Sequence, residues 1–111
     1  MRKSWLKVEV FLGMDETGGG KVSEREFARF VADVVTKSFP KGLTLYEAYG
    51  QMQHASGKIE KQPTRAIVIV CERSAANLTA IKKLVQAYRA QFNNPQAMVL
   101  TSPTTPTFYS D

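Results

Sequence analysis

The chain has 111 residues, of which 43% are hydrophobic and 23% charged, and its formal net charge is +5 at pH 7. This length suits one domain whose core needs no disulfide or metal support, and the composition excludes wholesale disorder. The single cysteine excludes an internal disulfide framework, and no segment approaches the ~20 apolar residues of a membrane span. Because the basic surplus is modest and scattered, we do not expect nucleic acid as a partner, and because no such span is present we do not expect a membrane.

A strand and a helix are predicted first. Residues 5–12 alternate as a strand does, which places these aliphatic side chains on one face: Leu6, Val8, Val10 and Leu12. A helix over about 23–37 should begin at a capping box, in which Ser23 and Glu26 bond to each other's backbone N–H groups. Its apolar stripe falls at helical spacing: Phe27, Phe30, Val31 and Val34.

Two strands follow, at 43–53 and 65–71, with a loop of small and polar residues between them. A second helix over about 74–93 has the clearest amphipathic pattern, with apolar residues at Leu78, Ile81, Val85, Tyr88 and Phe92. A last apolar stretch at 97–101 completes the order β-α-β-β-α-β. This is the order of the ferredoxin-like, or split-βαβ, fold. We therefore predict an α+β protein: a four-stranded antiparallel sheet with both helices on one face and the other face open.

We assign residues 1–101 to this single domain and residues 102–111 to a C-terminal tail rich in proline and aromatic residues. Pro103 and Pro106 disfavour a central strand there. The tail also holds Phe108 and Tyr109, which could cover the open face of the sheet or reach a neighbouring molecule.

The third predicted strand does not alternate, because residues 66–71 are all apolar. Such a run indicates burial on both faces of a sheet. The helices cover one face, and in a chain this short a second subunit is the simplest cover for the other. We therefore expect a homo-oligomer, either a dimer or a trimer.

The loop before the first helix resembles a calcium-binding loop only in part. Asp15 and Glu26 stand at the first and last positions of the template, but Thr17 and Gly19 occupy positions that need oxygen ligands. The glycines before Lys21 do not have the spacing of a phosphate-binding loop. The single histidine excludes a multi-histidine centre within one chain. We predict no metal and no cofactor.

Candidate site residues gather on or near the sheet in a polar and aromatic cluster: Glu9, Tyr46, Glu47, Tyr49, Gln51, Gln53, Arg65 and Glu72. One interpretation is that these side chains pair across the hairpin or at a subunit contact. The other is a ligand pocket on the open face or at a subunit interface. In that pocket Arg65 would bind a carboxylate or phosphate, Tyr49 would stack, Gln51 would orient the ligand, and Glu9 would complete the lining.

Three functions are compatible with these residues. The first is a homo-oligomeric domain that binds a small organic ligand, of which a small organic anion is one candidate, in a cleft on the open sheet face or at the subunit interface. The second is an enzyme of the lyase, isomerase or cofactor-free oxygenase type, with Glu9 or Glu47 as the catalytic acid or base. The third is a protein-interaction module without catalysis, in which the aromatic tail binds a partner.

Four short motifs stand in order along the chain: Phe11-Leu12-Gly13, Phe39-Pro40-Lys41-Gly42-Leu43-Thr44, Gly50-Gln51 and Pro63-Thr64-Arg65. Over roughly residues 8–100 they resemble a bacterial domain-of-unknown-function family. The resemblance implies a ferredoxin-like fold and no activity. Several relatives have Trp after Gly-Gln where this chain has Met52, so a stacking role there does not carry over. Many relatives carry an export leader, but Lys7 and Glu9 interrupt any apolar leader here, so we expect a cytoplasmic protein.

Overall fold

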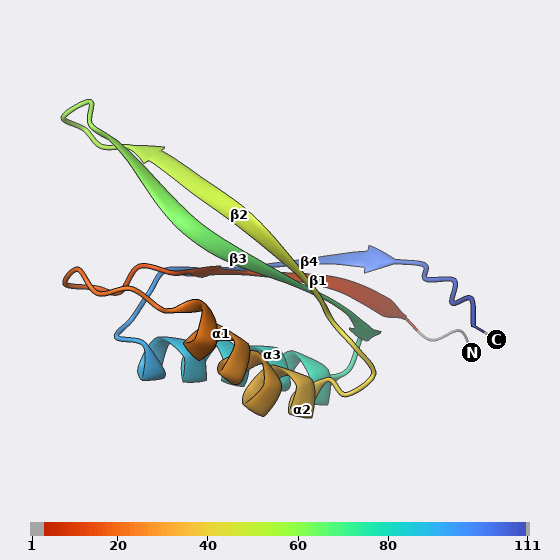
Figure 1. Ribbon diagram of the computed structural model, residues 1–111. Coiled ribbons are helices and arrows are strands. Elements are labelled where there is room, and N and C mark those ends of the chain that lie inside the picture. The colour runs from red at the N-terminus through yellow and green to blue at the C-terminus, as the bar shows by residue number, and fades with distance from the viewer. Residues whose placement is uncertain (1–3, 111) are drawn as a thin grey trace.

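The computed structural model describes residues 4–110. Its elements are β1 (Trp5–Gly13), α1 (Glu24–Phe30), the π-helical segment η1 (Val31–Val35), α2 (Thr36–Ser38), β2 (Thr44–Gln53), β3 (Ile59–Glu72), α3 (Ala75–Gln91) and β4 (Ala97–Thr104). The strands form one four-stranded antiparallel sheet in the order β2-β3-β1-β4. Figure 1 shows the helices together on one side of this sheet. The predicted ferredoxin-like arrangement is confirmed.

The core lies between the helices and one face of β1 and β3. In β1, Val8, Val10 and Leu12 are buried, as the alternation predicts. Their cross-strand neighbours Ile67 and Ile69 on β3 are buried on the same side. The helices close this layer with a set of buried aromatic and aliphatic side chains: Phe27, Phe30, Val35, Ile81, Leu84, Tyr88 and Phe92.

The first helix differs from the prediction because part of it is a π-helix. The capping box forms as expected, since the Ser23 hydroxyl accepts from the Glu26 N–H at 3.1 Å and the Glu26 carboxylate accepts from the Ser23 N–H at 3.0 Å. At η1 the turn widens, and the N–H of Thr36 bonds to the carbonyl of Val31. The wider turn brings Val35 into the core, where regular helical spacing predicts Val34.

The second helix also buries a different set from the one predicted. Leu78 is 43% exposed, whereas Leu84, absent from the predicted stripe, is 1% exposed. Leu78 lies in the first turn of α3, ahead of the buried residues Ile81, Leu84 and Tyr88.

Strand β3 is much longer than predicted, because it begins at Ile59 rather than at Arg65. Pairing with β1 starts at Thr64, so residues 49–63 form a two-stranded hairpin that no third strand of the described part of the chain pairs with. We call residues 49–63 the arm. Figure 1 shows the arm rising from the sheet on the side away from the helices. The radius of gyration is 15.5 Å, compared with about 13 Å for a compact domain of this length.

Strand β4 is an edge strand that runs to Thr104, past the predicted end at residue 101. Pro103 is therefore part of a strand, and an edge is the place in a sheet that tolerates proline. The first residues of the segment assigned to the tail thus pair with β1, while Phe108 contacts Trp5 at 5.8 Å between ring centroids.

The face of the sheet opposite the helices, which we call the open face, is largely apolar. The sequence predicts that residues 66–71 of β3 are buried on both faces, but within the single chain only the face toward the helices is fully buried. Ile69 is 1% exposed beneath the helices, whereas Val70 on the open face is 40% exposed in the single chain. The open face also carries Tyr46, Met98 and Leu100, each about half exposed.

Candidate functional site

A groove opens where β1 ends. β1 pairs with β3 as far as Gly13 and Thr64, and beyond this point the arm and β4 diverge. The groove has a volume of about 750 Å³. The arm, the end of β1, the start of β4 and one face of α3 line it: Phe11, Gly13, Ala48, Tyr49, Gly50, Gln62, Thr64, Val85, Arg89, Gln96, Ala97 and Met98.

The lining combines an apolar floor with a few polar groups. Phe11 and Met98 come from neighbouring strands and face the same side of the sheet. The side-chain amides of Gln62 and Gln96 and the hydroxyl of Thr64 supply donors and acceptors. An apolar cleft with a small number of polar groups is typical of sites that bind small molecules.

Arg89 is the one charged residue of the lining. Its Nε–H donates to the carbonyl of Pro95 at 3.0 Å, which holds the side chain at the groove. No ion pair of Arg89 occurs among residues 4–110. The terminal guanidinium nitrogens can therefore bind a ligand, and their planar arrangement matches a carboxylate or phosphate.

The floor of the groove is fixed by the core beneath it. The hydroxyl of Tyr88 donates to the carbonyl of Gly13 at 2.6 Å, and Tyr88 packs edge-on against Phe30 at 5.2 Å between ring centroids. Burial, followed by the nearby Glu16, raises the pKa of Tyr88, so this hydroxyl stays protonated. The close approach of Gln96 favours glycine at position 13, because a Cβ there would lie 3.1 Å from the Gln96 backbone oxygen.

The structure brings some of the predicted site residues together on the helix side of the arm and its base. Glu47, Tyr49 and Gln51 alternate on the same side of β2, and Glu47 lies opposite Arg65. The Arg65 guanidinium contacts the carboxylate of Glu24 at the start of α1 and lies 3.8 Å from that of Glu47. Arg65 thus links the base of the arm to the helix layer, and of these residues only Tyr49 also lines the groove.

Glu9 lies apart from the others, because it faces the opposite side of the sheet. Its cross-strand neighbours are Val68 and Leu100 on the open face, and its carboxylate lies 3.9 Å from the Nζ atom of Lys7. The expected lining by Glu9, Tyr49, Gln51 and Arg65 together is therefore not formed within one chain. The cause is strand parity, since Glu9 pairs with Val68 while Arg65 stands three residues before it.

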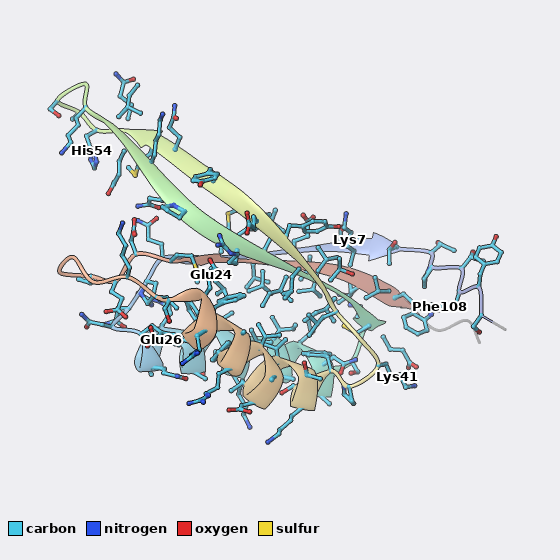
Figure 2. All side chains as sticks on the ribbon, viewed as in Figure 1. Lys7, Glu24, Glu26, Lys41, His54 and Phe108 are labelled. Atoms are coloured by element: carbon cyan, nitrogen blue, oxygen red, sulfur yellow. The ribbon has the colours of Figure 1, made fainter. Side chains whose placement is uncertain are left out.

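The rest of the predicted cluster is dispersed. Tyr46 lies on the open face and Gln53 lies near the tip of the arm, where its side-chain amide donates to the Gly57 carbonyl at 3.2 Å. Glu72 is at the far end of β3. Figure 2 shows His54 at the tip of the arm. Its imidazole lies 3.1 Å from the Glu60 carboxylate.

The opposite end of the molecule has a smaller cavity of about 360 Å³, beside the loop that joins α2 to β2. Cys71 lines it, and burial raises the pKa of this thiol, which keeps it protonated. No group of three or more potential metal ligands occurs within residues 4–110. Among these residues, each helix is too short or too polar to span a lipid bilayer.

Sequence reasoning missed Arg89, Gln62 and Gln96 as site residues. Arg89 is on the polar face of a predicted helix, where a charged residue is ordinary. Gln62 precedes the predicted strand at 65–71, and Gln96 precedes the last predicted strand. Only the divergence of the arm from β4 places these three residues around one groove, and no local pattern encodes that divergence.

Several solved structures have the same fold. A phage SAM lyase in complex with S-methyl-5'-thioadenosine has a TM-score of 0.64 and 13% identity, over 99% of this chain and 96% of that one. CutA from Synechococcus elongatus with Bis-Tris has a TM-score of 0.56 and 12% identity, over 95% and 88% of the two chains. B. subtilis GlnK with ATP has a TM-score of 0.51 and 15% identity, over 92% and 84%. At these identities the likeness concerns the fold alone.

The sequence itself has a more specific relationship. No curated protein matches the chain significantly. A family model described as a protein of unknown function, DUF3574, matches residues 7–108, which include every strand and helix except the first two residues of β1. The chain therefore belongs to the DUF3574 family.

Proposed function

We propose that the protein binds a small organic anion with a planar ring in the groove between the arm and β4, and that it does so as a homo-oligomer. The observation that carries the proposal is Arg89, a cation without an ion-pair partner among the described residues, at the edge of an otherwise uncharged groove. A groove of about 750 Å³ is within the size range of small-molecule sites.

The chemistry of the lining supports this ligand class. Phe11 supplies aromatic surface on which a flat ring can stack, and Tyr49 contributes to the lining from the arm. Ala48 and Gly50 lie on the same side of the sheet as Phe11 and leave room there because their side chains are small or absent. Arg89 supplies the positive charge for a carboxylate or phosphate, and Gln62 and Gln96 supply hydrogen bonds that fix orientation.

The similar structures add support at the level of the fold. Their bound molecules include S-methyl-5'-thioadenosine and ATP, which both carry a planar ring system. The same fold therefore accommodates ligands of this size. The proposal assigns no catalytic role to Glu9 or Glu47, because neither lines the groove.

Homo-oligomer formation is supported by the open face. Val70, Met98 and Leu100 are each at least 40% exposed in the single chain, on an extended sheet surface. A surface of this kind is costly to leave in water and marks an interaction site.

The test is a thermal-shift series with adenosine 5'-monophosphate, benzoate and inorganic sulfate as probes. We expect the two ring-bearing anions to raise Tm more than sulfate at equal concentration, because only they can use both the aromatic surface and Arg89. Binding by sulfate alone, or by none of the probes at millimolar concentration, would contradict the proposal.

A matched pair of variants locates the site. Arg89→Gln should abolish most of the Tm increase, whereas Lys82→Gln should preserve it, because Lys82 is an exposed cation on the same helix outside the groove. An equal response in the two variants would show that the anions bind elsewhere.

A further inference from the structure

The arm lacks the support that a hairpin needs in water. Residues 59–63 of β3 pair with β2 on one side. On the other side the Pro63 carbonyl accepts from the Met14 N–H at 2.9 Å, but within residues 4–110 no further strand pairs with them. A two-stranded hairpin by itself is at best marginally stable in water. The arm also exposes large apolar side chains, since Tyr49 is 80% exposed, Met52 45% and Ile59 54%.

Strand β4 lacks a pairing partner on its outer side and exposes apolar side chains. It is an edge strand of eight residues without a single charged side chain, and its open-face residues Met98 and Leu100 are 52% and 46% exposed. Edge strands are usually protected by charges, bulges or cover against pairing with other chains. Pro103 protects only the last part of β4, so residues 97–102 present a free backbone edge beside an apolar surface.

These two surfaces account for most of the exposed apolar side chains. Eleven large hydrophobic residues are exposed in the described part of the chain, and seven lie on the arm or the open face: Tyr46, Tyr49, Met52, Ile59, Val70, Met98 and Leu100. Because the arm rises on the open side of the sheet, a molecule that packs on the open face must also meet the arm (Figure 1).

We propose that the arm of one copy of this chain packs against β4 and the open face of a second copy. A second copy supplies both missing elements, since its β4 offers a strand edge to the arm and its arm offers apolar cover to β4. The contact joins two different surfaces of the same chain, which is the defining property of a heterologous interface.

The same contact completes the ligand groove, and this part of the inference rests on the proposed function. Met98 and Ala97 belong both to β4 and to the groove lining. An arm docked on β4 therefore lies at the open side of the groove and closes it. A chain that cannot assemble should bind the ring-bearing anion more weakly, even though its own groove residues are unchanged.

The experiment uses Ile59→Lys on the arm and Leu100→Lys on β4, with Leu78→Lys as the control. All three residues are apolar and 43–54% exposed, but Leu78 is on α3, away from both surfaces. Light scattering after size-exclusion chromatography gives the mass of each variant. We expect the wild type and Leu78→Lys to be oligomers, and Ile59→Lys and Leu100→Lys each to weaken assembly by at least about 30-fold.

Mixing the two defective variants gives the decisive measurement. A chain carrying Leu100→Lys still has a normal arm, and a chain carrying Ile59→Lys still has a normal β4. The mixture should therefore form a species of two chains, one of each variant, although neither variant assembles alone. If the contact joined arm to arm, Leu100→Lys alone would still assemble, and if it joined β4 to β4, Ile59→Lys alone would still assemble. Either of these results, or a mixture that stays monomeric, would overturn the proposal.

Two further results would also overturn it: a wild type that is monomeric at high micromolar concentration, or assembly that survives both substitutions. Circular dichroism establishes that each variant is folded, and Met98→Lys replaces Leu100→Lys if the latter does not fold. Failure of the proposed function is a separate outcome, since the masses are measured without ligand and the Tm series is measured on the assembled wild type.

Discussion

The two halves of the long hairpin show what a third strand and a helix layer contribute. In the lower half of β3, Ile67 and Ile69 have β1 beside them and helices beneath them, and both are buried. In the arm the same strand continues with Ile59, which has neither and is 54% exposed. The hairpin is therefore one continuous element in two environments. The lower half is held by its own chain, and the arm is an element that we expect another copy to hold.

The largest change in stability is predicted for a substitution in the core beneath the lower half of the hairpin. Phe30→Ala should lower the free energy of unfolding by about 3–5 kcal/mol, because it removes a fully buried ring and leaves a cavity in the aromatic cluster. Urea unfolding followed by circular dichroism measures the change. A cost near zero would mean that the aromatic cluster is not the core of the domain.

A smaller effect is expected for the hydroxyl that connects this core to the groove. Tyr88→Phe should lower the free energy of unfolding by about 1–3 kcal/mol, because the Gly13 carbonyl loses its buried hydrogen-bond donor. Since burial raises the folded-state pKa of Tyr88 above its unfolded value of about 10, the stabilisation is complete below that pH. It is lost as the pH rises above about 10 toward the folded-state pKa.

Urea unfolding at two pH values checks the sign of this effect. The wild type should lose more stability than Tyr88→Phe between about pH 8 and pH 11, because only the wild type has this ionisable group in the core. Equal losses in the two proteins would indicate that the Tyr88 hydroxyl is accessible to water in the folded state.

The third prediction compares a serine at the start of α1, in the helix layer that covers the lower half of the hairpin, with a serine in the turn of the arm. Ser23→Ala should lower the free energy of unfolding by about 1 kcal/mol, since the capping box at the start of α1 is lost. Ser56→Ala, in the turn of the arm, should cost less than about 0.5 kcal/mol, because its hydroxyl makes only a long contact to the Lys58 N–H at 3.4 Å. Denaturant midpoints of both variants give the comparison, and similar costs would remove the distinction between the two regions.

The smallest effect is expected in the arm. Met52→Ala should change the free energy of unfolding by less than about 0.5 kcal/mol at low micromolar concentration, where assembly contributes little. A cost above about 1 kcal/mol at that concentration would mean that the arm is held by its own chain. Hydrogen exchange should agree, with residues 49–63 exchanging faster than β1 in the dilute protein.

The sequence predicted the fold because its signals are local. Ser23 and Glu26 mark a helix start, and the alternation of Leu6, Val8 and Val10 marks one covered face, whatever the rest of the chain does. The start of β3 was missed because residues 59–64 include Glu60, Lys61 and Pro63, which are typical of a loop. They form a strand because β2 pairs with them, and that pairing is not encoded in their own pattern.

The candidate site was predicted less well, for a related reason. Tyr49 does line the groove, but Glu9 and Arg65 fall on opposite faces of the sheet, and a register is needed to know that. Arg89 has no local signal that separates it from other exposed cations of α3. Its position depends on the Pro95 carbonyl and on the divergence of two distant segments.

The π-helical segment gives the chain a place where its length can vary. Phe27 and Val35 are eight positions apart, which in a regular α-helix would set them about 80° apart around the axis. At a spacing of seven positions the difference would be about 20°. A family member that lacks one residue of Val31–Val35 would thus keep both side chains in the core on an unbroken α-helix. Alignments within the family should accordingly place a one-residue gap here without any change in the sheet or the groove.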